Sequence, residues 1–318
     1  MGGPTPARPD DSISRMDRHE IRHALTGPFP SLRTPFHQDG AIDFDGLRSV
    51  IDFCIDAGSR TVMLTFGDSL FTLLTDDEVA ELTRVTVQHT AGRAMVIAAD
   101  RQWATPKAVD FARYCRETGA DVLMVLPPDW CESCTASSLV EHFAAVAAEM
   151  PVMFITCGFG ERGLPFALDV MRRCLDTVDN IVALKDDVCG AFARQVTSLV
   201  ADRWAVISGG QKQNHLDLMP YGCVGYLSTF MTFAPRVARD YWCAIDRNDI
   251  TAATKIVRDL DMPLFDHLLG LEGSFDAGMH ALSEIVGHHG RWRRKPYHSL
   301  TDAQMDELRA VLNSLGVV

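Results

Sequence analysis

The sequence predicts an α/β fold, a (β/α)8 barrel followed by a C-terminal helical extension. Short apolar, β-prone runs recur about every thirty residues, and helical patterns lie between them. The runs are continuously apolar, which is typical of parallel strands buried on both faces. Eight strand–helix repeats indicate a barrel, and a doubly wound open sheet is the alternative. Against that alternative, no glycine-rich dinucleotide motif follows the first run.

Composition limits the class of protein. The 318 residues are 47% hydrophobic and 23% charged, which is a globular composition at a length that can bury a barrel-sized core. The net charge of −12 argues against nucleic acid or an anionic membrane as the main partner. The polar N-terminus has no signal-peptide core, and no run is long enough to span a membrane. We therefore expect a cytoplasmic protein.

The chain divides into three predicted parts. Residues 1–23 are polar and rich in Pro, Asp and Arg, so we expect a disordered tail. Residues 24–247 form the predicted barrel, and residues 248–318 form helices packed on it. The predicted strands are Pro30–Phe36, Thr61–Phe66, Ala94–Ala99, Asp121–Leu126, Pro151–Thr156, Ile181–Lys185, Ala205–Ser208 and Val224–Ser228.

Capping residues mark several of the predicted helices. Asp43 is expected to cap the first, which ends at Gly58. Thr75 and Glu78 form a capping box, and Thr105 is expected to cap a helix that ends at Gly119. The remaining predicted helices are Ser138–Glu149, Pro165–Leu175, Gly190–Val200, Gln213–Met219, Pro235–Arg247, Thr251–Leu260, Pro263–Leu271, Asp276–Val286 and Thr301–Leu315, and the basic stretch His288–Arg294 is interpreted as a solvated linker.

The nine cysteines are interpreted mainly as buried free thiols in a reducing compartment. Cys54, Cys115 and Cys243, among others, lie in apolar periodic runs. Cys131 and Cys134 form a single CxxC pair, whereas a structural zinc site needs a second ligand pair at matching spacing. We therefore predict no metal site.

Lys185 is the main catalytic candidate. It closes the apolar run Asn180–Lys185, at the strand end where barrel active sites lie. Only five of the 30 Lys and Arg residues are lysines, and the other four fall in predicted helices or loops. Burial lowers the pKa of a lysine and frees its amine to attack a carbonyl group, forming a Schiff base. Alternatively, the side chain reaches the barrel rim and pairs with Asp186 or Asp187.

A family resemblance adds to this interpretation from about Gly27 to the C-terminus. The chain resembles the family of dihydrodipicolinate synthase and N-acetylneuraminate lyase, which are class I aldolases on a (β/α)8 barrel. The resemblance implies that Lys185 is the Schiff-base lysine and that no cofactor is needed. It is carried by Thr34-Pro35-Phe36, Asp39-Gly40, Asp43, Leu74–Glu78, Gly119-Ala120-Asp121, Pro127-Pro128, Asn180–Lys185, Ser208-Gly209, Gly225–Ser228 and Pro235.

The loop after the second strand departs from the family pattern. The family usually has Gly-Thr-Thr-Gly-Glu there, which holds the substrate carboxylate, whereas this chain has Phe66-Gly-Asp-Ser-Leu70. Gly67, Asp68 and Ser69 are therefore substrate-binding candidates. An ionised Asp68 would repel a carboxylate, or its side chain points elsewhere as a turn residue; both alternatives stay open.

The end of the fifth strand also differs. The family keeps a tyrosine there as a proton relay, and this chain has Ile155 or Cys157, depending on the alignment. Thr156, Cys157 or a water molecule is the expected replacement. Arg162 matches a carboxylate-binding arginine of some members, or is a surface loop residue.

Two further positions complete the candidate substrate site, and a third concerns assembly. Gly209 and Leu227, at the ends of the last two strands, are expected to line the pocket. Trp130 lies where the family has a tyrosine shared between subunits. The resemblance implies a homo-oligomer, a dimer or a tetramer.

The sequence thus predicts a class I carbon–carbon or carbon–oxygen lyase, an aldolase or dehydratase. Its substrate would be a 2-oxo acid or aldehyde held as an iminium on Lys185, in a site that lacks the family tyrosine and threonine pair. The alternative is a barrel that has lost this activity and binds a metabolite or a partner.

Overall fold

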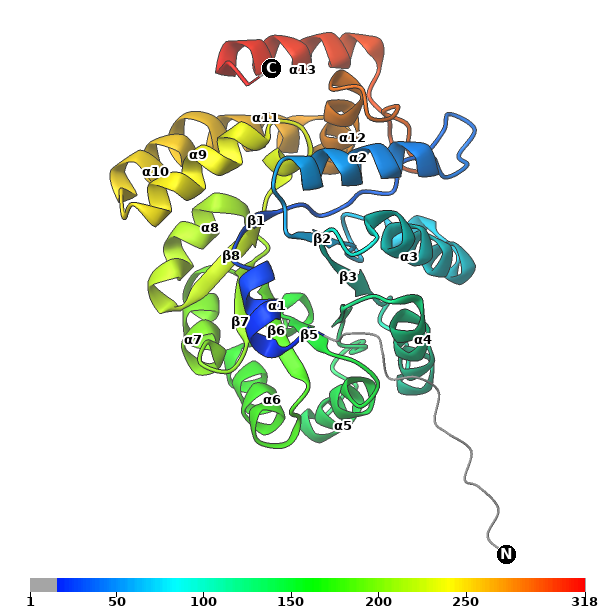
Figure 1. The fold of residues 1–318 in the computed structure, drawn as a ribbon, viewed down its shortest axis with the longest axis vertical. Helices are drawn as coiled ribbons and strands as arrows, with labels where there is room; N and C mark the ends of the chain where they lie inside the picture. Colours follow the sequence, from blue (N-terminus) through cyan, green and yellow to red (C-terminus); the bar gives the residue numbers. More distant parts are fainter. Residues whose placement is uncertain (1–15, 318) are drawn as a thin grey trace, which may run out of the picture.

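Eight parallel strands form a nearly closed barrel in the computed structural model, which describes residues 16–317 (Figure 1). The strands pair in the order β1-β8-β7-β6-β5-β4-β3-β2. Just beyond β1, the Leu32 amide donates to the Met63 carbonyl at 2.8 Å and links the two ends of the sheet. The strands are β1 (Gly27–Phe29), β2 (Thr61–Met63), β3 (Met95–Ala99), β4 (Val122–Val125), β5 (Val152–Ile155), β6 (Ile181–Asp186), β7 (Ala205–Ser208) and β8 (Cys223–Leu227).

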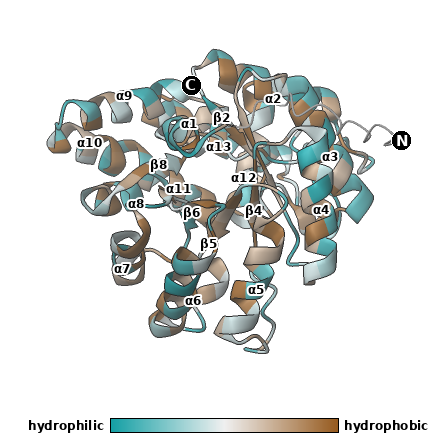
Figure 2. Cartoon of the chain, turned by 60° about the horizontal axis from the view of Figure 1, so that its bottom comes forward, coloured by the Kyte–Doolittle hydropathy of each residue, from teal (hydrophilic) through white to brown (hydrophobic). Residues whose placement is uncertain are grey.

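Helices surround this sheet and cover its outer face. Figure 2 shows hydrophobic colouring on central strands such as β4 and β5 and hydrophilic segments on the surrounding helices. The apolar runs thus form the buried strands, as continuous hydrophobicity predicts. The helices are α1 (Arg18–Ala24), α2 (Phe44–Asp56), α3 (Asp76–Thr90), α4 (Thr105–Thr118), α5 (Ala136–Ala147), α6 (Leu164–Thr177), α7 (Gly190–Val200), α8 (Gln211–Leu218), α9 (Pro235–Asp246), α10 (Ile250–Ile256), α11 (Met262–Gly270), α12 (Ser274–Ile285) and α13 (Asp302–Leu315).

The first strand was predicted too late in the chain. It is Gly27–Phe29 and not Pro30–Phe36, because residues 27–29 pair with Gly225–Leu227 of β8. The two strands approach closely: a Cβ on Gly225 would lie 2.7 Å from the Gly27 carbonyl oxygen. The residues after Phe29 instead cross the carboxyl end of the barrel, where the Thr34 hydroxyl donates to the Ser69 carbonyl.

Local capping explains where several helices start. The Asp43 carboxylate accepts from the Gly46 amide at 2.8 Å, and Thr75 and Glu78 form the predicted capping box. The predicted Thr105 cap is wrong: Ala104 precedes α4, and the Thr105 hydroxyl instead bonds to a ring nitrogen of His142 at 2.9 Å.

The predicted disordered tail includes a helix. Residues 1–15 lie outside the described part of the chain, but α1 spans Arg18–Ala24 and starts with a capping box between Asp17 and Glu20. Ile21 is buried, and the Arg22 guanidinium donates to the Ala201 and Trp204 carbonyls at 2.7 and 2.9 Å. Residue 204 precedes β7, so α1 packs at the amino end of the barrel (Figure 1). These contacts order the segment despite its polar composition.

The C-terminal helices lie together beside α9 and α2 (Figure 1). Apolar side chains of α11–α13 form one cluster with Phe230 and Val237. The cluster contains residues on both sides of position 248, so this packing does not divide the barrel from the extension there. The boundary stays a prediction. No helix within residues 16–317 combines the length and the apolarity needed to cross a membrane.

The basic stretch between α12 and α13 is not a solvated linker. His289 and Arg293 are buried. The Arg294 guanidinium donates to both carboxylate oxygens of Glu78 at 2.9 Å. These ion pairs and buried side chains fasten the stretch to the barrel, which the local charge alone does not reveal.

Candidate active site

Lys185 lies at the carboxyl end of β6 and lines a cavity of about 350 Å³. Its side chain is only 8% exposed. Catalytic sites of such barrels lie at this end, so the position agrees with the sequence prediction. The cavity is lined by Thr65, Phe66, Gly67, Asp68, Met124, Leu126, Ile155, Cys157, Lys185, Asp187, Gly209 and Leu227.

Asp187 is the direct partner of Lys185. The lysine Nζ contacts both carboxylate oxygens, with the second at 2.5 Å. Burial alone lowers the pKa of Lys185, but the charge and hydrogen bond of Asp187, helped by Asp68, outweigh burial and raise the pKa. The expected lowering of this pKa is therefore wrong, and the site holds an ammonium–carboxylate pair.

Gly209 makes room for this pair. A Cβ at this position would lie 1.8 Å from Asp187 Oδ1 and 2.8 Å from Lys185 Nζ. Real atoms cannot approach so closely, so the pair packs where a side chain would stand. Gly209 therefore lines the cavity as predicted, and its lack of a side chain shapes it.

Thr156 stabilises the site through hydrogen bonds to Asp186 and Asp187. Its buried hydroxyl donates to Asp186 Oδ1 at 2.9 Å and accepts from the Asp187 amide at 2.9 Å. The residue is not among those lining the cavity. These two hydrogen bonds hold the Asp186–Asp187 turn in place.

Asp68 lines the cavity and is ionised. Its Oδ1 lies 3.6 Å from the Arg33 Nη2. Burial raises the pKa of Asp68, but the Arg33 charge, the Ser31 hydroxyl and Lys185 together bring it below the usual value. Asp68 thus faces the site as an anion, in keeping with the first of the two sequence-based alternatives.

Ser69 does not line the cavity, contrary to expectation. It is fully buried, and its hydroxyl donates to the Leu32 carbonyl at 2.6 Å while accepting from the Thr65 amide at 3.0 Å. These bonds join the two loops that follow β1 and β2. The hydroxyl is therefore used within the protein.

Both residues proposed for the family tyrosine position line the cavity. Ile155 is the register partner of Lys185, and Cys157 follows two residues later. Burial, and then the charge of Asp187, raise the pKa of Cys157 to about 11. The thiol is therefore protonated at neutral pH.

Arg162 lies away from the cavity. Its guanidinium forms an ion pair with Asp129, donates to the Cys134 carbonyl at 3.1 Å and stacks 3.7 Å from the Phe166 ring centroid. These contacts fasten the loop after β4. The surface-loop alternative for Arg162 therefore fits the structure better than substrate binding.

Sequence reasoning missed Asp100, which follows β3. The carboxyl is fully buried, and its Oδ1 accepts from the Leu126 amide at 2.9 Å. Burial raises its pKa to about 7. Its position immediately after the predicted strand Ala94–Ala99 is the sequence feature that could have identified it.

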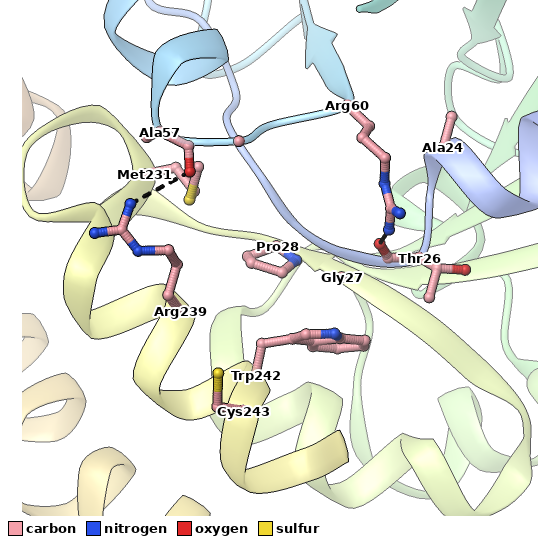
Figure 3. Close-up of a pocket in the computed structure, with 11 residues that line it drawn as sticks. Ala24, Thr26, Gly27, Pro28, Ala57, Arg60, Met231, Arg239, Trp242 and Cys243 are labelled. Carbon is pink, nitrogen blue, oxygen red and sulfur yellow. Dashed lines mark hydrogen bonds between the residues drawn. The ribbon is translucent and has the colours of Figure 1, made fainter. Parts of the chain in front are cut away.

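A second cavity, of about 290 Å³, lies near the amino ends of β1 and β2. Figure 3 shows Arg60 and Arg239 on opposite sides of it and the Trp242 ring below Gly27. Its lining residues include Cys243, which is exposed and not buried as expected. None of them is a lysine or a carboxylic acid, so we place the catalytic site at the other end.

Comparison with protein families supports these observations. The model of the dihydrodipicolinate synthetase family matches residues 24–315. A 4-hydroxy-tetrahydrodipicolinate synthase from Psychrobacter arcticus is 30% identical over 255 residues, covering 77% of this chain and 82% of that protein. A probable 5-dehydro-4-deoxyglucarate dehydratase from Streptomyces coelicolor is 28% identical over 237 residues, covering 73% of this chain and 72% of that protein.

Solved structures share the fold at lower sequence identity. Dihydrodipicolinate synthase from Oceanobacillus iheyensis has a TM-score of 0.83 at 19% identity, covering 95% of this chain and all of that one. YagE of E. coli K12, solved in complex with pyruvate, has a TM-score of 0.79 at 21% identity, covering 92% and 99% of the two chains. At these identities the likeness establishes the fold alone.

Proposed function

Because the chain belongs to the dihydrodipicolinate synthetase family, whose members are Schiff-base lyases, we propose that it is a lyase acting through an iminium on Lys185. We propose an aldolase or a dehydratase. The observation that carries the proposal is the buried Lys185 amine, which lines a cavity beside Asp187. The names of the relatives and the pyruvate complex of a structural neighbour support a 2-oxo acid as the first substrate class to test.

The ion pair suggests how the amine becomes nucleophilic. Asp187 accepts a proton from the Lys185 ammonium as the carbonyl carbon approaches Nζ. Nitrogen adds to that carbon, the oxygen takes one proton from the nitrogen and one back from Asp187, and the carbon–oxygen bond then breaks to release water and leave an iminium. Its positive charge lies near Asp187 and Asp68, so both carboxylates stabilise it.

The iminium then withdraws electrons from the neighbouring carbon. Loss of a proton there gives an enamine, and a carbon–carbon or carbon–oxygen bond at the next carbon is made or broken. We propose that the Cys157 thiol and Asp187 carry protons in a remodelled site without the family tyrosine. Gly67, Asp68, Gly209 and Leu227 would contact the substrate, since they line the same cavity.

The second candidate is a barrel that binds a metabolite without turnover. The raised pKa of Lys185 favours it, because an ammonium held by Asp187 can act simply as a cation for a ligand. The two candidates differ in whether a covalent iminium forms. They are separated by following a carbon–hydrogen bond next to the carbonyl, whose exchange an iminium on Lys185 accelerates.

The experiment measures hydrogen–deuterium exchange next to the carbonyl of pyruvate and of hydroxyacetone by ¹H NMR in D₂O. The proposal predicts that the protein accelerates exchange for at least one compound and that Lys185→Met abolishes the acceleration. Lys255→Met, which changes an exposed lysine, is the control and keeps the wild-type rate. Reversible stabilisation by either compound without exchange would favour the binding barrel.

Assembly and location stay proposals. The indole of Trp130 is 83% exposed on the loop after β4, and an exposed aromatic of this size is typical of a contact surface between protein copies. We propose a homo-oligomer in the cytoplasm, a dimer or a tetramer.

A further inference from the structure

The loop from Thr65 to Ser69 forms one wall of the catalytic cavity, and three of the hydrogen-bond donors around Asp68 are occupied within the protein. The Ser69 hydroxyl donates to the Leu32 carbonyl at 2.6 Å. The Asp68 amide donates to the Thr65 hydroxyl at 3.0 Å, and the Ser69 amide donates to the Thr65 carbonyl at 3.2 Å. A substrate carboxylate needs free donors, and these three are used within the protein, so beside Asp68 the loop leaves only the backbone amides of Phe66 and Gly67.

The side chain that this loop does offer is a hydrogen-bond acceptor. Asp68 lines the cavity, and Arg33 and Lys185 keep it ionised by lowering its pKa. An ionised carboxylate only accepts hydrogen bonds. Asp68 is therefore suited to a hydroxyl or an ammonium group.

Arg33 does not provide a binding site for a carboxylate of the substrate. Its guanidinium lies 3.6 Å from both Asp68 and Asp276, so two carboxylates share its charge. It is buried and is not among the residues that line the cavity. Arg33 thus acts by holding Asp68.

The charges around the cavity also disfavour a substrate carboxylate beside Asp68. Lys185 is already neutralised by Asp187, and Asp68 adds a second carboxylate to the lining. A substrate carboxylate beside Asp68 would be a third anion, and like charges at close range repel strongly in a partly buried site. The remaining wall is apolar and includes Leu126 and Leu227.

We infer that Asp68 binds a hydroxyl group of the substrate next to the reacting carbonyl, so that the protein selects a hydroxylated oxo compound over pyruvate. The inference rests on the proposed Schiff base at Lys185 and narrows its substrate. It departs from the expectation of a 2-oxo acid at this position. Any carboxylate of the substrate would lie away from Asp68.

A matched pair of probes tests this inference. Hydroxyacetone differs from pyruvate in one group, because a hydroxymethyl replaces the carboxylate. Each compound is incubated with the protein and cyanoborohydride; Lys185 Nζ adds to the carbonyl carbon, water leaves, and hydride reduces the iminium to a stable secondary amine. Mass spectrometry then gives the initial rate of labelling for each compound at equal concentration. We expect hydroxyacetone to label the wild type about 10-fold faster than pyruvate or more.

A variant separates the Asp68 charge from the general reactivity of ketones. In Asp68→Asn the preference should fall about 10-fold, mainly because pyruvate labels faster. Asp45→Asn removes a 96% exposed acid on α2 and should keep the wild-type preference. The comparison of the two probes on the wild type needs no variant, so it stands even where Asp68→Asn folds poorly.

The outcomes distinguish this inference from the proposed function. Faster labelling by pyruvate than by hydroxyacetone in the wild type overturns the inference and leaves the lysine lyase intact. An unchanged preference in a folded Asp68→Asn also overturns it. No labelling of Lys185 by either probe overturns the proposed function, and the inference with it.

Discussion

Lys185 and Asp187 form the ion pair on which the proposed chemistry depends. Burial disfavours the charged amine, and Asp187 reverses that effect by direct contact. The site therefore has a protonated lysine and, in contact with it, a carboxylate that can receive the proton. Gly209 keeps the space that the pair occupies.

Removing the charge of Asp187 should change the pH dependence of labelling. In Asp187→Asn the charge that raises the pKa of Lys185 is lost while burial still lowers it, so the pKa falls. The midpoint of the rate of reductive labelling against pH should move down by about one unit or more, with a lower maximal rate. The measurement is that rate from about pH 6 to about pH 10. Asp45→Asn is the control, and an unmoved midpoint would contradict the role of Asp187.

Asp100 makes a second prediction at this scale, concerning stability. Its folded pKa of about 7 lies above the usual 3.8, so the folded state binds an extra proton between these values. The free energy of unfolding should therefore decrease as pH rises from about 5 to about 8, by about 3 kcal/mol for this group. Asp100→Asn should lose this component. Urea unfolding of both proteins at about pH 5 and about pH 8 measures the difference, and equal pH dependence would show that Asp100 ionises normally.

Helix α1 is the element whose stabilising role is least evident from composition. The short helix buries Ile21 and is tied by Arg22 to the chain just before β7. A helix of this length is marginal alone, so its packing on the amino end of the barrel keeps it folded.

Truncating its buried side chain tests that packing. Ile21→Ala should lower the free energy of unfolding by about 2 to 5 kcal/mol, because Ile21 is 1% exposed. His19→Ala, on the exposed face of α1, should change it by less than about 0.5 kcal/mol. Denaturant titration compares the two. A result below about 1 kcal/mol for Ile21→Ala would mean that α1 is not part of the stable core.

The elements that sequence reasoning predicted well are those with strong local signals. Continuous apolar runs located β2 to β8, and capping residues located the start of α2 and of α3. The first strand was misplaced because its boundary depends on pairing with β8, which no local pattern reveals. The capping box at Asp17 and Glu20 was present in the sequence, but polar composition obscured it.

The candidate site residues also fall into two groups, those that local sequence position predicted correctly and those that it did not. Lys185, Gly67, Asp68, Cys157, Gly209 and Leu227 line one cavity because they end strands or follow them directly. Ser69, Thr156 and Arg162 lie nearby, but each is engaged by hydrogen bonds within the protein. Which neighbouring side chain points inward depends on those long-range bonds, and sequence spacing does not contain them.

Across the whole molecule, a buried ion pair connects the barrel to the C-terminal helices. Lys212 of α8 lies 2.5 Å from Asp261, in the turn of π-helix between α10 and α11, and both side chains are fully buried. The Lys212 ammonium also lies 3.9 Å from the Phe230 ring centroid. Loss of either partner would leave an unpaired buried charge and would lower the free energy of unfolding.

Breaking the pair should destabilise the protein without affecting the site. Lys212→Met leaves Asp261 unpaired and should lower the free energy of unfolding by about 3 to 5 kcal/mol. Adding Asp261→Leu removes the stranded charge and should recover most of the loss. Urea unfolding measures both, and labelling of Lys185 should persist in the double variant. A double variant as unstable as the single one would contradict this explanation.

Lys185 and Lys212 are also the two buried lysines among the five in the chain, so they provide the most direct test of the central claim. The wild-type protein is reduced with cyanoborohydride in the presence of hydroxyacetone or pyruvate, digested, and mapped by tandem mass spectrometry. We expect an adduct on Lys185, none on Lys212, and loss of the adduct in Lys185→Met. Labelling spread over the exposed lysines, or an adduct absent from Lys185 with both compounds, would contradict it.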